Sequence, residues 1–166
     1  MAARADIGKL PINAERVDIR GQLESALMAV PETEVSIEWV GEEAPVAFAD
    51  PSRVRQIIRN LLVNAERYGG PDVRACFGSD GDGVWLEIID DGQGIPDDSV
   101  VEVFKPYSRA HNALGQPSSV GLGLTVSRKL AELMGGTLDY RYEDGWSRFR
   151  LQLPPVGRVH TGDPST

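Results

Sequence analysis

The sequence predicts an α/β sandwich, in which a mixed sheet of about five strands carries about three helices on one face. Helices are predicted in three segments, residues 19–28, 51–68 and 121–134, and apolar residues recur at helical spacing along the second. Short runs of alternating or β-branched residues lie between and after these segments, as strands require. Gly and Pro pairs separate most of them. At 166 residues the chain has the length of one domain.

The first helix is expected over Ile19–Met28, and the helix over residues 51–68 begins with Asp50 as N-cap and Pro51 at its first position. Gly69-Gly70-Pro71 ends that helix. Asp80 and Asp82 are interpreted as turn residues rather than metal ligands. The strands are expected at residues 35–40, 46–49, 72–77, 84–89, 138–142 and 146–153, with a loop over 78–83 and a turn at 143–145. Residues 1–12 are interpreted as a leader or an extraneous edge, 13–154 as the domain and 155–166 as a loose tail.

The helix over residues 51–68 carries polar residues beside its apolar stripe. Asn60, Asn64 and Arg67 share one flank, because steps of three and four residues stay on one helical face. An Asn side-chain oxygen suits Mg²⁺, which takes the rest of its shell from waters and phosphate oxygens. Arg67 is placed to pair with a phosphate, and Tyr68 offers an aromatic wall for a base. An ordinary amphipathic surface helix is the alternative interpretation.

The predicted strand Val84–Ile89 runs into Asp90-Asp91-Gly92-Gln93-Gly94. A carboxylate at the end of a strand can accept a hydrogen bond from an exocyclic amine such as that of adenine. Gly92 and Gly94 allow the backbone to approach a ligand closely. A plain Asp-Gly turn is the alternative. The motif is neither a dinucleotide fingerprint, because the third Gly is absent, nor an EF-hand loop.

A third motif, Val120-Gly121-Leu122-Gly123-Leu124, opens the last predicted helix, which Gly135-Gly136 ends. Free N–H groups and the positive end of the helix dipole at such a start can seat a phosphate. The alternative is that these Gly residues only permit close packing. The chain contains no P-loop.

In this order and spacing, the three motifs resemble the catalytic ATP-binding domain of bacterial sensor histidine kinases. That domain has the Bergerat-type fold shared with gyrase, a heat-shock chaperone and the mismatch-repair protein MutL. The resemblance covers about residues 13–154, and residues 11–19 resemble the family's short entry strand. It implies binding of ATP with Mg²⁺ and transfer of the γ-phosphoryl group to a histidine.

The resemblance assigns roles to individual residues. Asn60 and Asn64 match the asparagine box, with Asn64 as the Mg²⁺ ligand, and Asp90, Gly92 and Gly94 match the box that reads adenine. The Phe104–Arg109 segment resembles the phenylalanine box, and residues 96–120 would form a lid that nucleotide orders. Ser119 stands where the family usually has a further Gly. The full set of implied ATP-binding residues is Asn60, Asn64, Arg67, Tyr68, Asp90, Gly92, Gly94, Ile95, Lys105, Arg109, Gly121, Leu122, Gly123 and Leu124, and Asn60, Asn64 and Arg67 are the implied catalytic residues.

One position bears on the type of reaction. In ATP-hydrolysing members of the superfamily, a Glu one helical turn before the metal-binding Asn activates water, and here that position is Asn60. An amide cannot act as a general base near neutral pH. Glu66 follows Asn64 and would point elsewhere on the helix. The sequence therefore argues against an efficient ATPase and for an external nucleophile.

Composition sets further bounds. The net charge of −8 and the scattered basic residues argue against a nucleic-acid partner. No apolar run is long enough to span a membrane, and no signal peptide is visible. The single Cys76 cannot form an internal disulfide, which fits a cytoplasmic location, and its strand position predicts a buried side chain. The parent kinase could still be membrane-anchored.

The chain lacks a recognisable phosphoacceptor. Its two histidines, His111 and His160, lie in the predicted lid and tail, outside any acceptor motif of the family. The expected partner is therefore a histidine-bearing dimerisation domain, in the same parent protein or as a split-kinase subunit, and indirectly a response regulator. The isolated domain is expected to be a monomer. The alternatives are an anti-sigma-type serine kinase and a non-catalytic ATP-sensing domain.

Overall fold

A computed structural model of the protein describes residues 10–30, 33–40, 45–105 and 123–157. Its centre is a five-stranded mixed sheet in the order β2-β4-β5-β7-β6. The strands are β2 (Val35–Val40), β4 (Val73–Asp80), β5 (Gly83–Asp90), β6 (Thr137–Glu143) and β7 (Trp146–Leu153). Only β2 and β4 pair in parallel, and the other neighbours are antiparallel. The predicted mixed sheet is confirmed.

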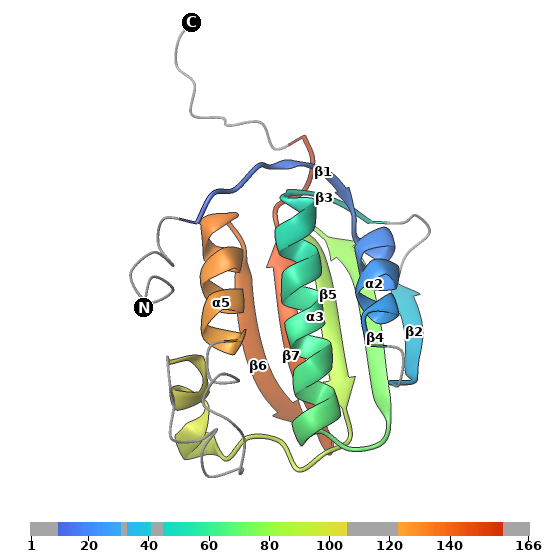
Figure 1. The fold of residues 1–166 in the computed structure, drawn as a ribbon, viewed down its shortest axis with the longest axis vertical. Helices are drawn as coiled ribbons and strands as arrows, with labels where there is room; N and C mark the ends of the chain where they lie inside the picture. The colour runs from blue at the N-terminus through green and yellow to red at the C-terminus, as the bar shows by residue number, and fades with distance from the viewer. Residues whose placement is uncertain (1–9, 31–32, 41–44, 106–122, 158–166) are drawn as a thin grey trace, which may run out of the picture.

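Three α-helices cover one face of this sheet: α2 (Ile19–Met28), α3 (Pro51–Tyr68) and α5 (Gly123–Leu133). They lie side by side, with α3 between the other two (Figure 1). The predicted α/β sandwich with three helices on one face is therefore confirmed for the described part of the chain. A separate two-stranded sheet pairs β1 (Glu15–Asp18) with β3 (Val46–Ala49).

Helix α3 forms where the sequence predicts it. The Asp50 side chain accepts hydrogen bonds from the backbone N–H groups of Ser52 and Arg53 and thereby caps the helix. Its apolar stripe is buried against the sheet, and the flank beside this stripe carries the two half-buried Asn residues. The buried residues of the stripe are Val54, Ile57, Ile58, Leu61, Leu62 and Ala65.

The strand bounds differ from the prediction in the first hairpin. Strand β4 extends to Asp80 and β5 begins at Gly83. A two-residue turn therefore joins them instead of the predicted loop over 78–83. The Asp80 carboxylate accepts hydrogen bonds from the N–H groups of Asp82 and Gly83, so this side chain serves the turn as expected. The entry strand is also shorter than residues 11–19 and spans Glu15–Asp18.

The prediction that Cys76 is buried is wrong. Cys76 alternates with the buried Ala75 and Phe77, so it lies on the sheet face opposite the core and is partly exposed. Its cross-strand neighbours are Glu38 and Glu87. Its partial burial first and these two carboxylates second raise the pKa of the Cys76 thiol, against the opposing effect of Arg148 and Arg150. The strand period thus places this thiol away from the helices.

Candidate functional site

The polar flank of α3 opens on a cleft of about 680 Å³. Asn60, Asn64 and Arg67 line it together, as the helical spacing predicts. Gly123 and Leu124, at the start of α5, line its other side. The structure thus brings together the asparagine motif and the described part of the third motif, which lie about 60 residues apart in sequence.

Asn60 joins the two helices that border this cleft. Its Nδ2 lies 3.3 Å from Gly123 O and 2.9 Å from Ser127 Oγ, and it donates to both. Because a carbonyl oxygen can only accept, the atom facing Gly123 must be the amide nitrogen. Ser127 is fully buried, so this contact lies within the packing of α3 against α5. This link between the helices is not evident from the sequence.

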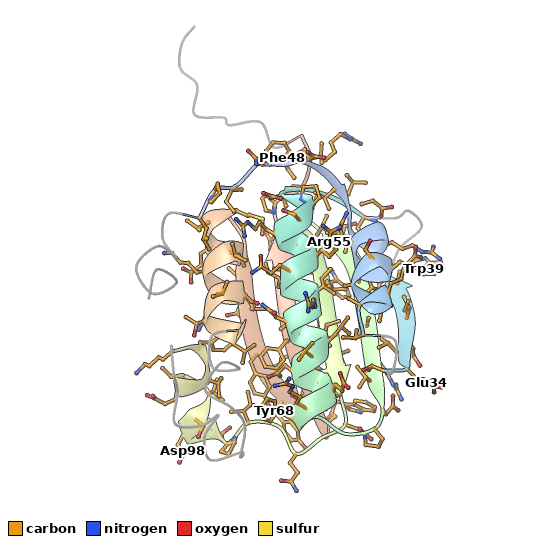
Figure 2. The ribbon with its side chains drawn as sticks, viewed as in Figure 1. Glu34, Trp39, Phe48, Arg55, Tyr68 and Asp98 are labelled. Atoms are coloured by element: carbon orange, nitrogen blue, oxygen red, sulfur yellow. The ribbon has the colours of Figure 1, made fainter. Side chains whose placement is uncertain are left out.

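A second cleft, of about 470 Å³, lies at the end of α3 and β5. Its lining includes Tyr68, Asp90, Gly92, Gly94 and Ile95, which the sequence analysis had already singled out. Tyr68 lies on the last turn of α3, where Figure 2 labels it. This second cleft therefore brings the Asp90–Gly94 motif together with the aromatic residue at the end of α3.

Asp90 ends β5 as a carboxylate that is only 4% exposed. Its Oδ1 accepts hydrogen bonds from the N–H of Gly92 at 2.8 Å and of Gly70 at 3.4 Å. Burial raises the pKa of the Asp90 carboxyl, although these two bonds oppose the shift. Both bonds end on Oδ1, which leaves Oδ2 for a ligand in the cleft.

The backbone at the end of α3 can approach the Asp90 side chain closely because its residues there are Gly. A β-carbon at Gly69 would lie 2.6 Å from Asp90 Cγ, so only Gly fits there. The sequence predicts that Gly69 and Gly70 end the helix. Their contact with the carboxylate is seen only in the structure, where Gly70 donates to Asp90, 20 residues later in the chain.

Gly94 and Ile95 are held by the last strands of the sheet. The N–H of Ile95 donates to Tyr140 Oη at 2.7 Å. Gly94 has φ +76°, and a β-carbon there would lie 2.5 Å from Tyr142 Cδ2. A larger residue at this position would be strained by both its conformation and its neighbours. The turn that follows Asp90 is therefore fixed against β6.

Sequence reasoning missed several residues of the second cleft. Ser147 and Phe149 on β7 line it, as does Val103 in the short helix η3 (Glu102–Phe104), which follows η2 (Asp97–Ser99). Ser147 lies opposite Asp90 in the antiparallel register of β5 and β7. The alternation of polar and apolar residues along β7 was visible, but the register that places Ser147 beside the carboxylate was not.

Some predicted site residues lie elsewhere or are not described. Lys105 borders neither cleft, and its Nζ lies 2.9 Å from Glu102 Oε1 with the Lys side chain 57% exposed. Arg109, Gly121 and Leu122 fall outside the described residues, as do His111, Ser119 and His160. Glu66 is exposed and lines neither cleft, which agrees with the expectation that it points away.

The two clefts share Asn64 and Leu124 and therefore meet at one junction. One end is apolar and aromatic and carries a buried carboxylate, which suits a purine base with an exocyclic amine. The other end carries amides, Arg side chains and a helix start, which suit phosphates. Such a bipartite site defines the class of the protein as a nucleoside-triphosphate-binding domain.

The family follows from comparison with known proteins. Residues 49–157 match the model of the Histidine kinase-, DNA gyrase B-, and HSP90-like ATPase family, and the chain belongs to this family. The chain is 38% identical over 118 residues to the sensor protein TorS of Escherichia coli, covering 69% of this chain and 13% of that protein. It is 29% identical over 164 residues to the probable sensor histidine kinase TcrY of Mycobacterium tuberculosis, covering 95% of this chain and 34% of that protein.

Solved structures agree with this assignment. The ATP-binding domain of PrrB from Mycobacterium tuberculosis matches 86% of this chain and 98% of its own, with a TM-score of 0.67 and 25% identity. The mycobacterial sensor histidine kinase MprB matches 86% of this chain and 100% of its own, with a TM-score of 0.72 and 24% identity. The chain is thus an ATPase domain of the histidine-kinase type found in two-component systems, and it spans about a third or less of the curated relatives named above.

Among the described residues, no helix combines the length and the apolar character that a membrane span requires. The same residues also contain no group of three or more His, Cys, Asp or Glu side chains placed to hold a metal ion.

Proposed function

We propose that the domain, taken as residues 13–154, binds Mg-ATP across the two joined clefts and transfers the γ-phosphoryl group to a histidine on a separate dimerisation domain. The single observation that carries the proposal is the junction at Asn64 and Leu124, where the base-binding end meets the phosphate-binding end. In the whole protein, this activity would serve two-component signalling in the cytoplasm, and a response regulator would receive the phosphoryl group indirectly, from the phosphorylated histidine. Alone, the domain would be a monomer.

In this proposal the adenine occupies the second cleft. Its exocyclic amine donates to Asp90 Oδ2, since Oδ1 already accepts two backbone N–H groups. Tyr68 and Ile95 contact the base, while Gly92 and Gly94 allow the turn to approach it. A buried carboxylate in this position selects adenine over a 6-oxo purine, which would present an oxygen to it.

The triphosphate extends past Asn64 into the first cleft. Mg²⁺ fits there, because the Asn64 amide oxygen supplies one neutral ligand and phosphate oxygens and waters supply the others. When bound, Mg²⁺ neutralises phosphate charge. Arg67 lines the same cleft and neutralises further charge. Arg109 and the N–H groups at Gly121, Leu122, Gly123 and Leu124 complete the phosphate contacts in this proposal, whereas Lys105 pairs with Glu102 outside both clefts.

The transfer itself needs no base from this chain. A neutral imidazole nitrogen of the acceptor attacks the γ-phosphorus, the bond between that phosphorus and the β,γ-bridging oxygen breaks, and ADP leaves with the bond's electron pair, while the other ring nitrogen releases its proton to water. The domain positions the reactants and stabilises the charge. Asn60 cannot activate water, so hydrolysis remains slow.

The test mixes the chain with γ-labelled ATP, Mg²⁺ and purified histidine-bearing dimerisation domains from the same genome. Label should appear only on the added domain, as an acid-labile and base-stable phosphate. Asn64→Ala should reduce transfer by about a hundredfold or more, because it removes the only protein metal ligand of the proposal. ATP binding without transfer to any domain would contradict the kinase assignment, and wild-type transfer by Asn64→Ala would contradict the role of Asn64.

A further inference from the structure

The turn that follows β5 lines the second cleft but has no regular secondary structure. Residues 92–95 lie outside every helix and strand, and among the described residues they make no backbone–backbone hydrogen bond. Gly92, Gly94 and Ile95 nevertheless line the cleft in which adenine is proposed to bind. A loop without backbone hydrogen bonds opens easily unless side chains hold it. The contacts that hold this turn therefore decide how completely the cleft is formed before a nucleotide binds.

Two side-chain acceptors hold the turn, one at each end. Asp90 Oδ1 accepts the N–H of Gly92 at 2.8 Å, and Tyr140 Oη accepts the N–H of Ile95 at 2.7 Å. The turn passes the end of the sheet where β6 and β7 meet, and Tyr140 belongs to β6 (Figure 1). A β-carbon at Gly94 would lie 2.7 Å from Tyr140 Oη, so Gly at this position lets the backbone come this close to the hydroxyl. The turn is thus tied to its own strand at one end and to β6 at the other.

The ring and the hydroxyl of Tyr140 have separate partners. The ring packs against the hydrophobic core, and its centroid lies 4.9 Å from that of Phe149, which lines the second cleft. Tyr140 itself lines neither cleft. A Phe at this position would keep the packing of the ring, so the core does not require the hydroxyl. The hydroxyl therefore acts on the cleft through the backbone of Ile95.

We propose that Tyr140 is a positioning residue for adenine binding, whose hydroxyl holds the turn of residues 92–95 in its binding form by accepting the N–H of Ile95. The inference rests on the proposed function, because it concerns the base-binding end of the same site. Without the hydroxyl the turn leaves this form for part of the time, and the apparent Kd for ATP rises as the competent fraction falls. Loss of one neutral hydrogen bond corresponds to roughly a three- to tenfold change in an equilibrium constant. Phosphate binding is spared, because Ile95 does not line the first cleft.

The test compares Tyr140→Phe with the matched control Tyr142→Phe. Tyr142 lies on the same strand and is 48% exposed, and its hydroxyl makes no hydrogen bond within the described part of the chain. Tyr140→Phe should raise the Kd and the KM for ATP by roughly three- to tenfold, while kcat for transfer to the acceptor domain at saturating ATP is retained. The Kd for magnesium tripolyphosphate, a phosphate chain without a base, should not change. Hydrogen exchange at the Ile95 amide should be faster in Tyr140→Phe, and Tyr142→Phe should behave as wild type in every assay.

The outcomes separate this inference from the proposed function. An unchanged Kd for ATP in folded Tyr140→Phe would overturn the role of Tyr140 and leave the proposed function intact. Equal weakening of ATP and tripolyphosphate binding would show general damage and would also overturn that role. If Tyr140→Phe does not fold, the wild-type chain decides, because rapid exchange of its Ile95 amide without nucleotide would contradict a turn held in advance. A wild-type chain that binds no ATP would overturn both the inference and the proposed function.

Discussion

Replacing Asp90 by Asn probes the adenine end of the site without changing its shape. The Asn side chain keeps one oxygen, which the N–H groups of Gly92 and Gly70 require at the position of Oδ1. Its NH₂ group then takes the position of Oδ2 and faces the exocyclic amine of adenine. In the variant, the Asn NH₂ group and the adenine amine would both be hydrogen-bond donors, whereas in the wild type the amine donates to the charged oxygen Oδ2.

The expected loss follows from that hydrogen bond. A hydrogen bond to a charged group contributes about 1.5–3 kcal/mol, so the Kd for ATP should rise roughly 10- to 150-fold. Inosine triphosphate carries an oxygen at the same ring position and can accept from the new NH₂ group. Its Kd should fall for Asp90→Asn relative to wild type, so nucleotide preference should reverse.

The pKa of Asp90 predicts how Asp90→Asn changes the stability of the fold. Burial raises the pKa of the Asp90 carboxyl, so its ionisation costs more in the folded than in the unfolded chain. Below the ordinary value of 3.8 the carboxyl is protonated in both states, and stability is lost as the pH rises through the folded-state pKa. Asp90→Asn removes that penalty, so its Tm at pH 7 should equal or exceed that of wild type.

The assay is isothermal titration of ATP and inosine triphosphate into both proteins, with thermal unfolding at pH 7 as the control for folding. Weaker ATP binding by a protein with a lower Tm would point to damage instead of a lost contact. Unchanged ATP affinity in a folded Asp90→Asn variant would refute the assignment of the carboxylate to adenine.

Two further substitutions test the packing that holds the site. Asn60→Ala removes the hydrogen bonds to Gly123 O and buried Ser127 Oγ, so urea unfolding should show a loss of about 1–3 kcal/mol, and an unchanged midpoint would contradict the link between α3 and α5. Asp50→Ala removes the cap of α3 and should cost about 1–2 kcal/mol at pH 7. Burial alone would raise the pKa of the Asp50 carboxyl, but its hydrogen bonds lower this pKa overall. The stability that ionised Asp50 gives the wild-type protein should therefore be lost as the pH falls below 3.8. In acid denaturation, Asp50→Ala should lack this pH dependence.

Local signals explain why much of the fold was predictable. The N-cap at Asp50 and the apolar stripe of α3 act within one helix, so the sequence contains the whole determinant. The turn at Asp144-Gly145 is similar, because both residues adopt positive φ, as a two-residue hairpin requires. The adenine-reading motif was found for the same reason, since Asp90 and its glycines are contiguous.

Contacts that depend on strand register were not predictable from local patterns. Ser147 lies opposite Asp90 only because β5 and β7 pair in one antiparallel register, although the two residues are 57 positions apart in the chain. The partnership of β1 with β3 in a sheet of their own likewise depends on tertiary packing. The Gly69–Asp90 approach was missed because a Gly that ends a helix has a sufficient local explanation, which conceals its second role.

Asn60 has a second role of the same kind, and it bears on how this family separates transfer from hydrolysis. By resemblance, Asn60 stands where ATP-hydrolysing members have a Glu whose carboxylate activates water, and Asn60 has no such carboxylate. The structure adds that its NH₂ group donates to Gly123 O, and a Glu has no N–H to offer that carbonyl. A carboxylate placed there would face a carbonyl oxygen at the helix joint unless it turned away. The residue that leaves no general base in the proposed mechanism therefore also supports the joint between α3 and α5.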